Sequence, residues 1–248
     1  MEQKEKGKVK INAKRIIEFG KYYVKMSDKQ KRYLKIRWRI DRILAAIILV
    51  ILFPVFILVG LALKVSAPDE PVFFLQKRVG MDAHCFSIIK FRTMRSNAPK
   101  NVATGELEDA EQYISPLGRF LRATSIDELP QLINVVRGEM ALIGPRPLVY
   151  TERKIRFLRR WYGIYQVKPG ITGWAQVNGR DTVGLYDKVF FDREYLQRAS
   201  FIFDLKIAIK SIAVVLGQHG VIDGKIDLEK QKENTVLMKE SKKQTRKS

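Results

Sequence analysis

The sequence has very little of what metal-binding and redox proteins usually carry. Cys85 is its single cysteine, and His84 and His219 are its two histidines. One cysteine excludes an intramolecular disulfide and a CxxC metal motif. Two histidines argue against a zinc site or a histidine-dependent catalytic triad. A reducing, cytoplasm-facing environment is compatible with this cysteine content but is not required by it.

Several nucleotide-binding motifs are also missing. The chain contains no GxxxxGK[ST], no GxGxxG and no Asp-x-Asp. These absences argue against a P-loop NTPase, a dinucleotide enzyme and the glycosyltransferases that clamp a metal with Asp-x-Asp.

Positive charge is abundant, with a formal net charge of +20 over 248 residues. Such an excess points to nucleic acid, anionic lipid or a phosphorylated substrate. Residues 1–42 carry 15 Lys and Arg against 5 Asp and Glu, and they precede an apolar segment. Because positive-inside topology explains this charge and no nucleic-acid-binding motif is present, we expect no nucleic-acid partner. Residues 1–36 fit a solvated helix, a flexible leader or an interfacial helix on anionic lipid.

Residues 43–63 form a run without a polar side chain. As one helix the run would measure about 31 Å, the thickness of a bilayer core. Basic residues flank both of its ends, which favours both ends on the cytoplasmic side. Pro54 lies in the middle and breaks the helical hydrogen-bond ladder. The segment alone leaves a kinked spanning helix and a re-entrant helix open, and we take 37–66 as its bounds.

Residues 67–220 predict a small cytoplasmic domain of helices and short strands, so the fold class is α/β (α+β). Residues 221–248 are rich in Lys and Glu and predict a disordered tail. The expected elements are strands at 72–76 and within 84–94, a surface loop at 96–113, two short helices within 115–148, loop or short strand at 167–181, and helix over most of 189–217.

The stretch "SIDELP" places two adjacent carboxylates at a predicted helix start. Ser125 and Glu128 have capping-box spacing, and Pro130 fits a first helical turn. Acidic residues favour a helix N-terminus, so a purely structural explanation suffices for Asp127 and Glu128. The same position attracts phosphate and would keep both carboxylates ionised, as a nucleophile or a Mg²⁺ ligand requires.

The surroundings favour the chemical explanation. Arg122 precedes the acidic pair, and Arg146 follows it between Pro145 and Pro147. Arginine suits bidentate phosphate recognition, and flanking prolines restrict its movement. Hard oxygen ligands favour Mg²⁺ over zinc. These parts predict metal-assisted phosphoryl transfer at a membrane surface.

Other polar residues have two explanations each. Lys90 and Arg92 share one face of a predicted strand, either as a solvated edge or as part of the active site. Gln176, Asn178 and Arg180 stand beside glycines and could line a polar substrate pocket.

Several blocks of the sequence together resemble the pattern of a known protein family. They are Asp41…Pro54…Lys64, "PVFFLQKRVG", "IIKFRTM", "LGRFLRATSIDELPQLINVVRGEMALIGPRPL", "KPGITGWAQVNGRD" and "FDREYL…FDLKIAIKSI". The chain resembles the bacterial sugar transferases, specifically the small monotopic phosphoglycosyltransferases, over residues 37–217.

The resemblance implies a reaction. Family members move a sugar-1-phosphate from a nucleotide sugar, typically a UDP-sugar, to undecaprenyl phosphate, and so begin capsule, exopolysaccharide, O-antigen or glycoprotein glycan assembly. By position, Asp127 is the nucleophile and Glu128 the Mg²⁺ ligand. Arg122 and Arg146 handle phosphate, and Pro145-Arg146-Pro147 lies near the nucleotide.

The resemblance also implies a place in the cell. The membrane segment would be a re-entrant helix that is broken at Pro54, on the cytoplasmic face of the bacterial plasma membrane. Its residues Arg37, Arg39 and Asp41 would lie at the lipid headgroups. The usual Ser-Pro break is Phe53-Pro54 here, and the usual Lys-Arg pair is Arg37-Trp38. A homodimer is compatible with the sequence, but nothing in it indicates one. The competing hypothesis is a basic membrane adaptor without activity, which gives no reason for the cluster of acids and arginines.

Overall fold

The computed structural model describes residues 22–98, 110–179 and 185–215. Its contacts divide the chain into Met1–Ser211 and Ile212–Ser248, and all contacts described below lie within the first unit. Residues 99–109 of the loop predicted at 96–113 and the predicted disordered tail from residue 221 lie outside the described residues, and the end of that loop forms a 3₁₀ turn at Ala110–Tyr113.

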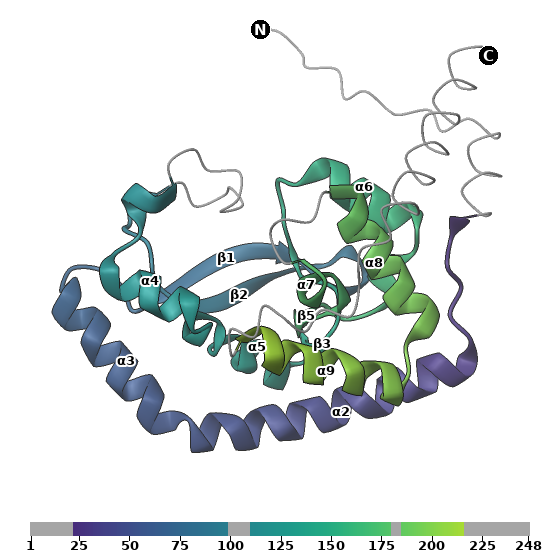
Figure 1. The fold of residues 1–248 in the computed structure, drawn as a ribbon, viewed down its shortest axis with the longest axis horizontal. Helices are drawn as coiled ribbons and strands as arrows, with labels where there is room; N and C mark the ends of the chain where they lie inside the picture. The colour runs from purple at the N-terminus through teal and green to yellow at the C-terminus, as the bar shows by residue number, and fades with distance from the viewer. Residues whose placement is uncertain (1–21, 99–109, 180–184, 216–248) are drawn as a thin grey trace, which may run out of the picture. The chain divides into compact units, whose positions relative to one another are not determined.

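Two small sheets form the β-structure (Figure 1). Strand β1 (Phe73–Val79) lies between β2 (Cys85–Phe91) and β4 (Leu148–Val149), and both pairings are antiparallel. Strand β3 (Ala141–Ile143) pairs in parallel with β5 (Gly170–Thr172). The mixed α and β architecture matches the predicted class. The first strand runs three residues beyond its predicted end, because its pairing with β2 continues to Val79.

The helices carry most of the residues that the structure describes. Their bounds are α2 Asp28–Ile51, α3 Phe53–Ser66, α4 Pro116–Ala123, α5 Gln131–Arg137, α6 Arg153–Trp161, α7 Trp174–Val177, α8 Leu185–Arg198 and α9 Phe201–Val215, with short 3₁₀ turns at Met81–Ala83, Ala110–Tyr113, Ile126–Glu128 (η4) and Ile164–Gln166. The prediction of loop or short strand at 167–181 is confirmed by β5 and corrected at α7, where a single helical turn follows the strand.

Helices α2 and α3 meet at a bend of 61°. Leu52 ends one helix and begins the other, two residues before Pro54, which cannot donate to the carbonyl of Val50. Among the described residues no single helix is long and apolar enough to cross a membrane, whereas this bent pair is, by length and composition only. Helix α2 begins at Asp28, not at residue 37, because Ser27 and Gln30 form a capping box.

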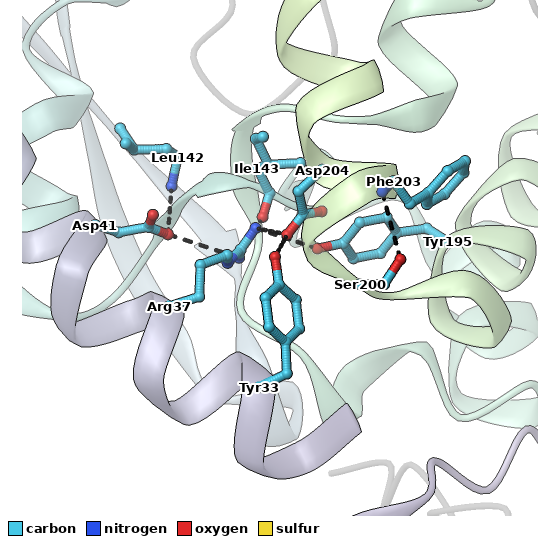
Figure 2. Close-up of polar contacts among 9 residues, drawn as sticks. All are labelled: Tyr33, Arg37, Asp41, Leu142, Ile143, Tyr195, Ser200, Phe203 and Asp204. Carbon is cyan, nitrogen blue, oxygen red and sulfur yellow. Dashed lines mark hydrogen bonds and ion pairs between the residues drawn. The ribbon is translucent and has the colours of Figure 1, made fainter. Parts of the chain in front are cut away.

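A buried polar network joins α2 to the rest of the domain (Figure 2). Arg37 donates to Asp204 of α9 at 2.8 Å and to the carbonyl of Ile143 at 2.7 Å. The hydroxyl of Tyr33 also donates to Asp204, at 2.6 Å. The backbone N–H of Leu142 donates to Asp41 at 3.2 Å. The network therefore holds α2 against both α9 and strand β3.

Three apolar clusters surround these elements. The largest packs Leu34 of α2 against α6, α8 and α9. A second packs Ala45 of α2 against β2 and α5, and a third packs Leu63 of α3 against Phe91 and Leu121. One side of the α2–α3 pair thus belongs to the core.

Candidate active site

The acidic pair lies in a 3₁₀ turn rather than at the start of an α-helix. Ser125 adopts a left-handed conformation, with φ 58°, and its side chain makes no capping bond. The capping box predicted for Ser125 and Glu128 is therefore wrong. Helix α5 starts later, at Gln131, with Pro130 at its N-cap. The left-handed residue ends the run of α4 and turns the chain sharply, so Asp127 and Glu128 project from η4.

Glu128 is the centre of a charge cluster. The ammonium of Lys90, from β2, donates to its Oε1 at 2.6 Å. Nη2 of Arg146 donates to the same oxygen at 3.0 Å. Burial alone would raise the pKa of Glu128, but the charges of Arg146 and Lys90 outweigh burial and hold the pKa well below its usual range. Glu128 is therefore a carboxylate at neutral pH.

Lys90 is perturbed in the opposite sense. Burial lowers the pKa of its ammonium, and the nearby charge of Glu128 offsets only part of that effect. The strand holds this cation where solvent cannot screen it.

Asp127 has a different environment from its neighbour. It is only 7% exposed. Burial raises its pKa, and the charge of Glu128 adds to the rise, while Lys90, Arg122 and Arg146 oppose it. The prediction that a helix dipole keeps Asp127 ionised is therefore corrected, because α5 begins four residues later and burial dominates. Ionisation of this carboxyl depends on the cations around it.

The predicted residues Arg122 and Arg92 differ in whether they lie near the acidic pair. Arg122, in the last turn of α4, donates to the hydroxyl of Thr93 at 2.8 Å and lies close enough to Asp127 to lower its pKa. Arg92 instead faces away from the acidic pair, with Glu70 at 3.6 Å and the carbonyl of Pro71 at 3.0 Å. Of the two basic residues predicted on this strand, only Lys90 reaches the acidic pair.

The Pro145-Arg146-Pro147 segment is held along its backbone. The N–H of Gly170 donates to the carbonyl of Pro145 at 3.0 Å. Arg159 donates to the carbonyl of Arg146 at 2.7 Å, and Arg78 to that of Pro147 at 3.0 Å. The Arg146 guanidinium therefore reaches Glu128 from a fixed backbone.

Two of the three predicted pocket residues, Gln176 and Asn178, bond to the backbone around α7. The side-chain amide of Gln176 donates to the carbonyl of Ile171 at 3.4 Å, and that of Asn178 to the carbonyl of Trp174 at 2.7 Å. These bonds hold the turn around α7. Arg180 lies outside the described residues.

The predicted headgroup contacts are corrected for two residues. Arg37 and Asp41 are turned inward and belong to the network of Figure 2, because they hydrogen-bond to Asp204 and Leu142. Arg39 is exposed on α2 and remains a candidate for lipid contact.

Sequence reasoning gave no role to Arg78 or Arg159 at this site. The burial of Arg159 could have been predicted from the sequence. Arg159 follows Ile155 by four residues on α6, and both are buried, so an arginine interrupts the apolar face of the helix. A buried arginine in that position requires an acidic partner, and Asp192 is that partner, at 2.6 Å.

Few side chains at this site could coordinate a metal ion. Among the residues that the structure describes, no group of three His, Cys, Asp or Glu side chains could hold a metal ion. The neighbouring carboxylates of Asp127 and Glu128 are hard oxygen donors of the kind that Mg²⁺ takes together with substrate phosphates. The residues fit a Mg²⁺ that a substrate helps to hold, not an all-protein cage.

An acidic pair ringed by Lys90, Arg122 and Arg146 is the kind of charge cluster that suits a phosphate-like group. Residues 32–218 match the family described as "Bacterial sugar transferase", and the chain belongs to that family.

Three relatives illustrate the match. The chain is 40% identical over 179 residues to "UDP-glucose:undecaprenyl-phosphate glucose-1-phosphate transferase" of Escherichia coli, covering 69% of this chain and 38% of that protein. It is 39% identical to "Uncharacterized sugar transferase EpsL" of Bacillus subtilis, covering 74% of this chain and 89% of that protein. It is 33% identical to "Exopolysaccharide production protein ExoY" of Sinorhizobium fredii, covering 73% and 85%. The match therefore spans well under half of the first relative.

Proposed function

We propose that this chain transfers a sugar-1-phosphate from a UDP-sugar to undecaprenyl phosphate and so begins assembly of a bacterial surface glycan such as exopolysaccharide, capsule, O-antigen or glycoprotein glycan. The observation that carries the proposal is the convergence of Lys90 and Arg146 on Glu128, beside the buried carboxyl of Asp127. Membership in the sugar transferase family and the printed names of the relatives support the same reaction class.

The proposed chemistry proceeds in two displacements. An oxygen of Asp127 attacks the phosphorus that carries the sugar. The bond between that phosphorus and the oxygen shared with the UMP phosphate breaks, and UMP leaves. A phosphate oxygen of undecaprenyl phosphate then attacks the same phosphorus, and the bond to Asp127 breaks. The product is an undecaprenyl diphosphate sugar. The attacking carboxyl must be ionised.

Each cation has a role in this scheme. Lys90 and Arg122 oppose the raised pKa of Asp127 and favour its ionised form. Arg146, whose side chain is 42% exposed, can reach the phosphate of the donor while it contacts Glu128. Glu128, aided by Asp127, would hold Mg²⁺, which when bound neutralises phosphate charge in the transition state.

The site would work at a bilayer. The outer sides of α2 and α3 expose a continuous set of large apolar residues, which are Ile36, Ile40, Ile43, Leu44, Ile47, Val50, Ile51, Phe53, Ile57, Leu58, Leu61 and Val65. An exposed apolar surface of this extent marks a membrane or protein contact. We propose that the bent pair enters and leaves the cytoplasmic face of the plasma membrane, with Arg39 at the headgroups.

The direct test is UMP release by the purified protein from a panel of UDP-sugars, with undecaprenyl phosphate and Mg²⁺ present. Asp127→Asn should abolish turnover, by at least about 10³-fold, because an amide is not a competent nucleophile. Asp69→Asn, at an exposed position, serves as the matched control and should keep full activity.

A second measurement addresses the covalent step. Without lipid acceptor, the parent protein should release about one UMP per molecule and gain the mass of a phosphosugar on the peptide that contains Asp127. Turnover by Asp127→Asn at the parent rate, or a burst without an adduct, would contradict this mechanism.

A further inference from the structure

The Pro145-Arg146-Pro147 segment accepts hydrogen bonds from donors on three separate elements, β5, α6 and β1. The carbonyls of Pro145, Arg146 and Pro147 accept hydrogen bonds from the N–H of Gly170, from Arg159 and from Arg78. Neither proline has an N–H, so the segment cannot secure itself as part of a regular strand ladder. Donors from outside the segment must therefore hold it.

Of the two side-chain donors, Arg159 is the buried one and Arg78 is half-buried. Arg159 is 3% exposed, and its partner Asp192 on α8 is 1% exposed. Nε and Nη2 of Arg159 contact the same carboxylate oxygen of Asp192, at 2.8 and 2.6 Å. This leaves Nη1 directed at the carbonyl of Arg146, at 2.7 Å. The planar guanidinium is thus fixed on one side and donates to the site on the other.

We infer that Arg159, oriented by Asp192, is a positioning residue that sets the backbone of Arg146 so that its guanidinium lies between Glu128 and the phosphate of the donor sugar nucleotide. The inference rests on the proposed function. Arg146 has a long side chain that would otherwise sample many rotamers, and a fixed backbone lowers the entropy lost when it engages a phosphate.

A purely structural role for the buried pair makes a different prediction. If Arg159 only neutralised Asp192 within the core, any loss on mutation would be the same whether or not Arg146 were present. If Arg159 acts through Arg146, its effect must vanish once the Arg146 side chain is removed. The two roles can therefore be separated by a double-mutant cycle.

Arg159→Lys is the informative variant because it keeps a positive charge beside Asp192. One ammonium on a shorter reach cannot reproduce the forked contacts to both Asp192 and the Arg146 carbonyl. Arg160→Lys is the matched control, on the next residue of α6 and exposed. We expect Arg159→Lys to lower kcat/KM for the UDP-sugar about tenfold, and Arg160→Lys by less than about twofold.

The cycle is completed in an Arg146→Ala background. There, Arg159→Lys should change kcat/KM by less than about twofold. An equal loss in both backgrounds would overturn the inference. If Arg159→Lys fails to fold, Asp192→Asn takes its place, because it keeps an oxygen that can accept from Arg159 while weakening its orientation, and the same comparison between backgrounds applies.

Hydrogen–deuterium exchange gives a readout that does not depend on turnover. Arg159→Lys should speed exchange of the amides of Arg146 and Leu148, and Arg160→Lys should leave them unchanged. Equal exchange in the two variants would overturn the positioning role. If the parent protein transferred no sugar phosphate from any donor, the proposed function would fail, and the exchange result would still decide whether Arg159 holds this segment.

Discussion

At the scale of single residues, the pKa values of the two adjacent carboxyl groups are shifted in opposite directions. Glu128 is paired with two cations and stays ionised, whereas burial raises the pKa of Asp127. Neighbouring acids with divergent pKa values are typical of sites where each acid has a separate task. A buried carboxyl that must be ionised to react also costs the folded state free energy.

That cost can be measured with Asp127→Asn. Because the folded pKa of Asp127 lies above its unfolded value of about 3.9, the parent protein loses stability as the pH rises through the folded pKa. The variant lacks this loss. We expect Asp127→Asn to melt at a higher temperature than the parent at pH 7 and at the same temperature below about pH 3.9. Thermal melts from pH 3.5 to 8 test this, with Asp69→Asn as control, and an equal or lower melting temperature at pH 7 would contradict it.

A second residue-scale prediction separates Lys90 from Arg92, which the sequence could not distinguish. Lys90 contacts Glu128, and Arg92 contacts Glu70. We expect Lys90→Gln to lower kcat/KM by about 10²-fold, because it removes a cation beside both carboxylates. Arg92→Gln should lower it by less than about threefold. Similar losses in steady-state UMP release for the two variants would show that the contacts with Glu128 do not set activity.

At the scale of elements, the pattern of apolar residues was sufficient for most helices and for the β1–β2 pair. It was not sufficient for the turn that carries the acidic pair. "SIDELP" has the spacing of a capping box, but Ser125 takes a left-handed conformation, which local sequence preference does not predict for serine. The inward direction of Arg37 was equally hidden, because its partner Asp204 lies far along the chain. Long-range pairing decided the direction of Arg37.

The bend between α2 and α3 yields an element-scale prediction. Replacing Pro54 with alanine restores a donor to the carbonyl of Val50 and removes the steric reason for the bend. In a Cys85→Ser background, cysteines at Lys29 and Ser66 should both react with an impermeant maleimide only from the cytoplasmic side. Adding Pro54→Ala should place the two positions on opposite sides in part of the population. Unchanged labelling would mean that residues other than Pro54 set the bend.

At the scale of the whole domain, helix α2 connects the apolar helix pair to the charge cluster. Its outer side is apolar and exposed, while Arg37 and Asp41 on its inner side hold strand β3, which leads directly into Pro145. The helix that we propose contacts lipid is therefore hydrogen-bonded to the strand that leads into the segment carrying Arg146. This arrangement gives a physical reason for burying Arg37 and Asp41 on the inner side of α2.

Asp204→Asn tests how strongly this network holds the domain together. Arg37 is buried and donates to Asp204 at 2.8 Å, and Tyr33 donates to the same oxygen at 2.6 Å. Removing the negative charge leaves the Arg37 guanidinium poorly compensated, so the free energy of unfolding should fall by about 3–5 kcal/mol. The matched control is Asp28→Asn, which removes the exposed pair with Lys31 and should cost less than about 1 kcal/mol. Denaturant unfolding in detergent measures both. If the two variants lost the same free energy, the network would not be what fastens α2 to α9 and β3, and apolar packing around Leu34 would have to account for the attachment instead.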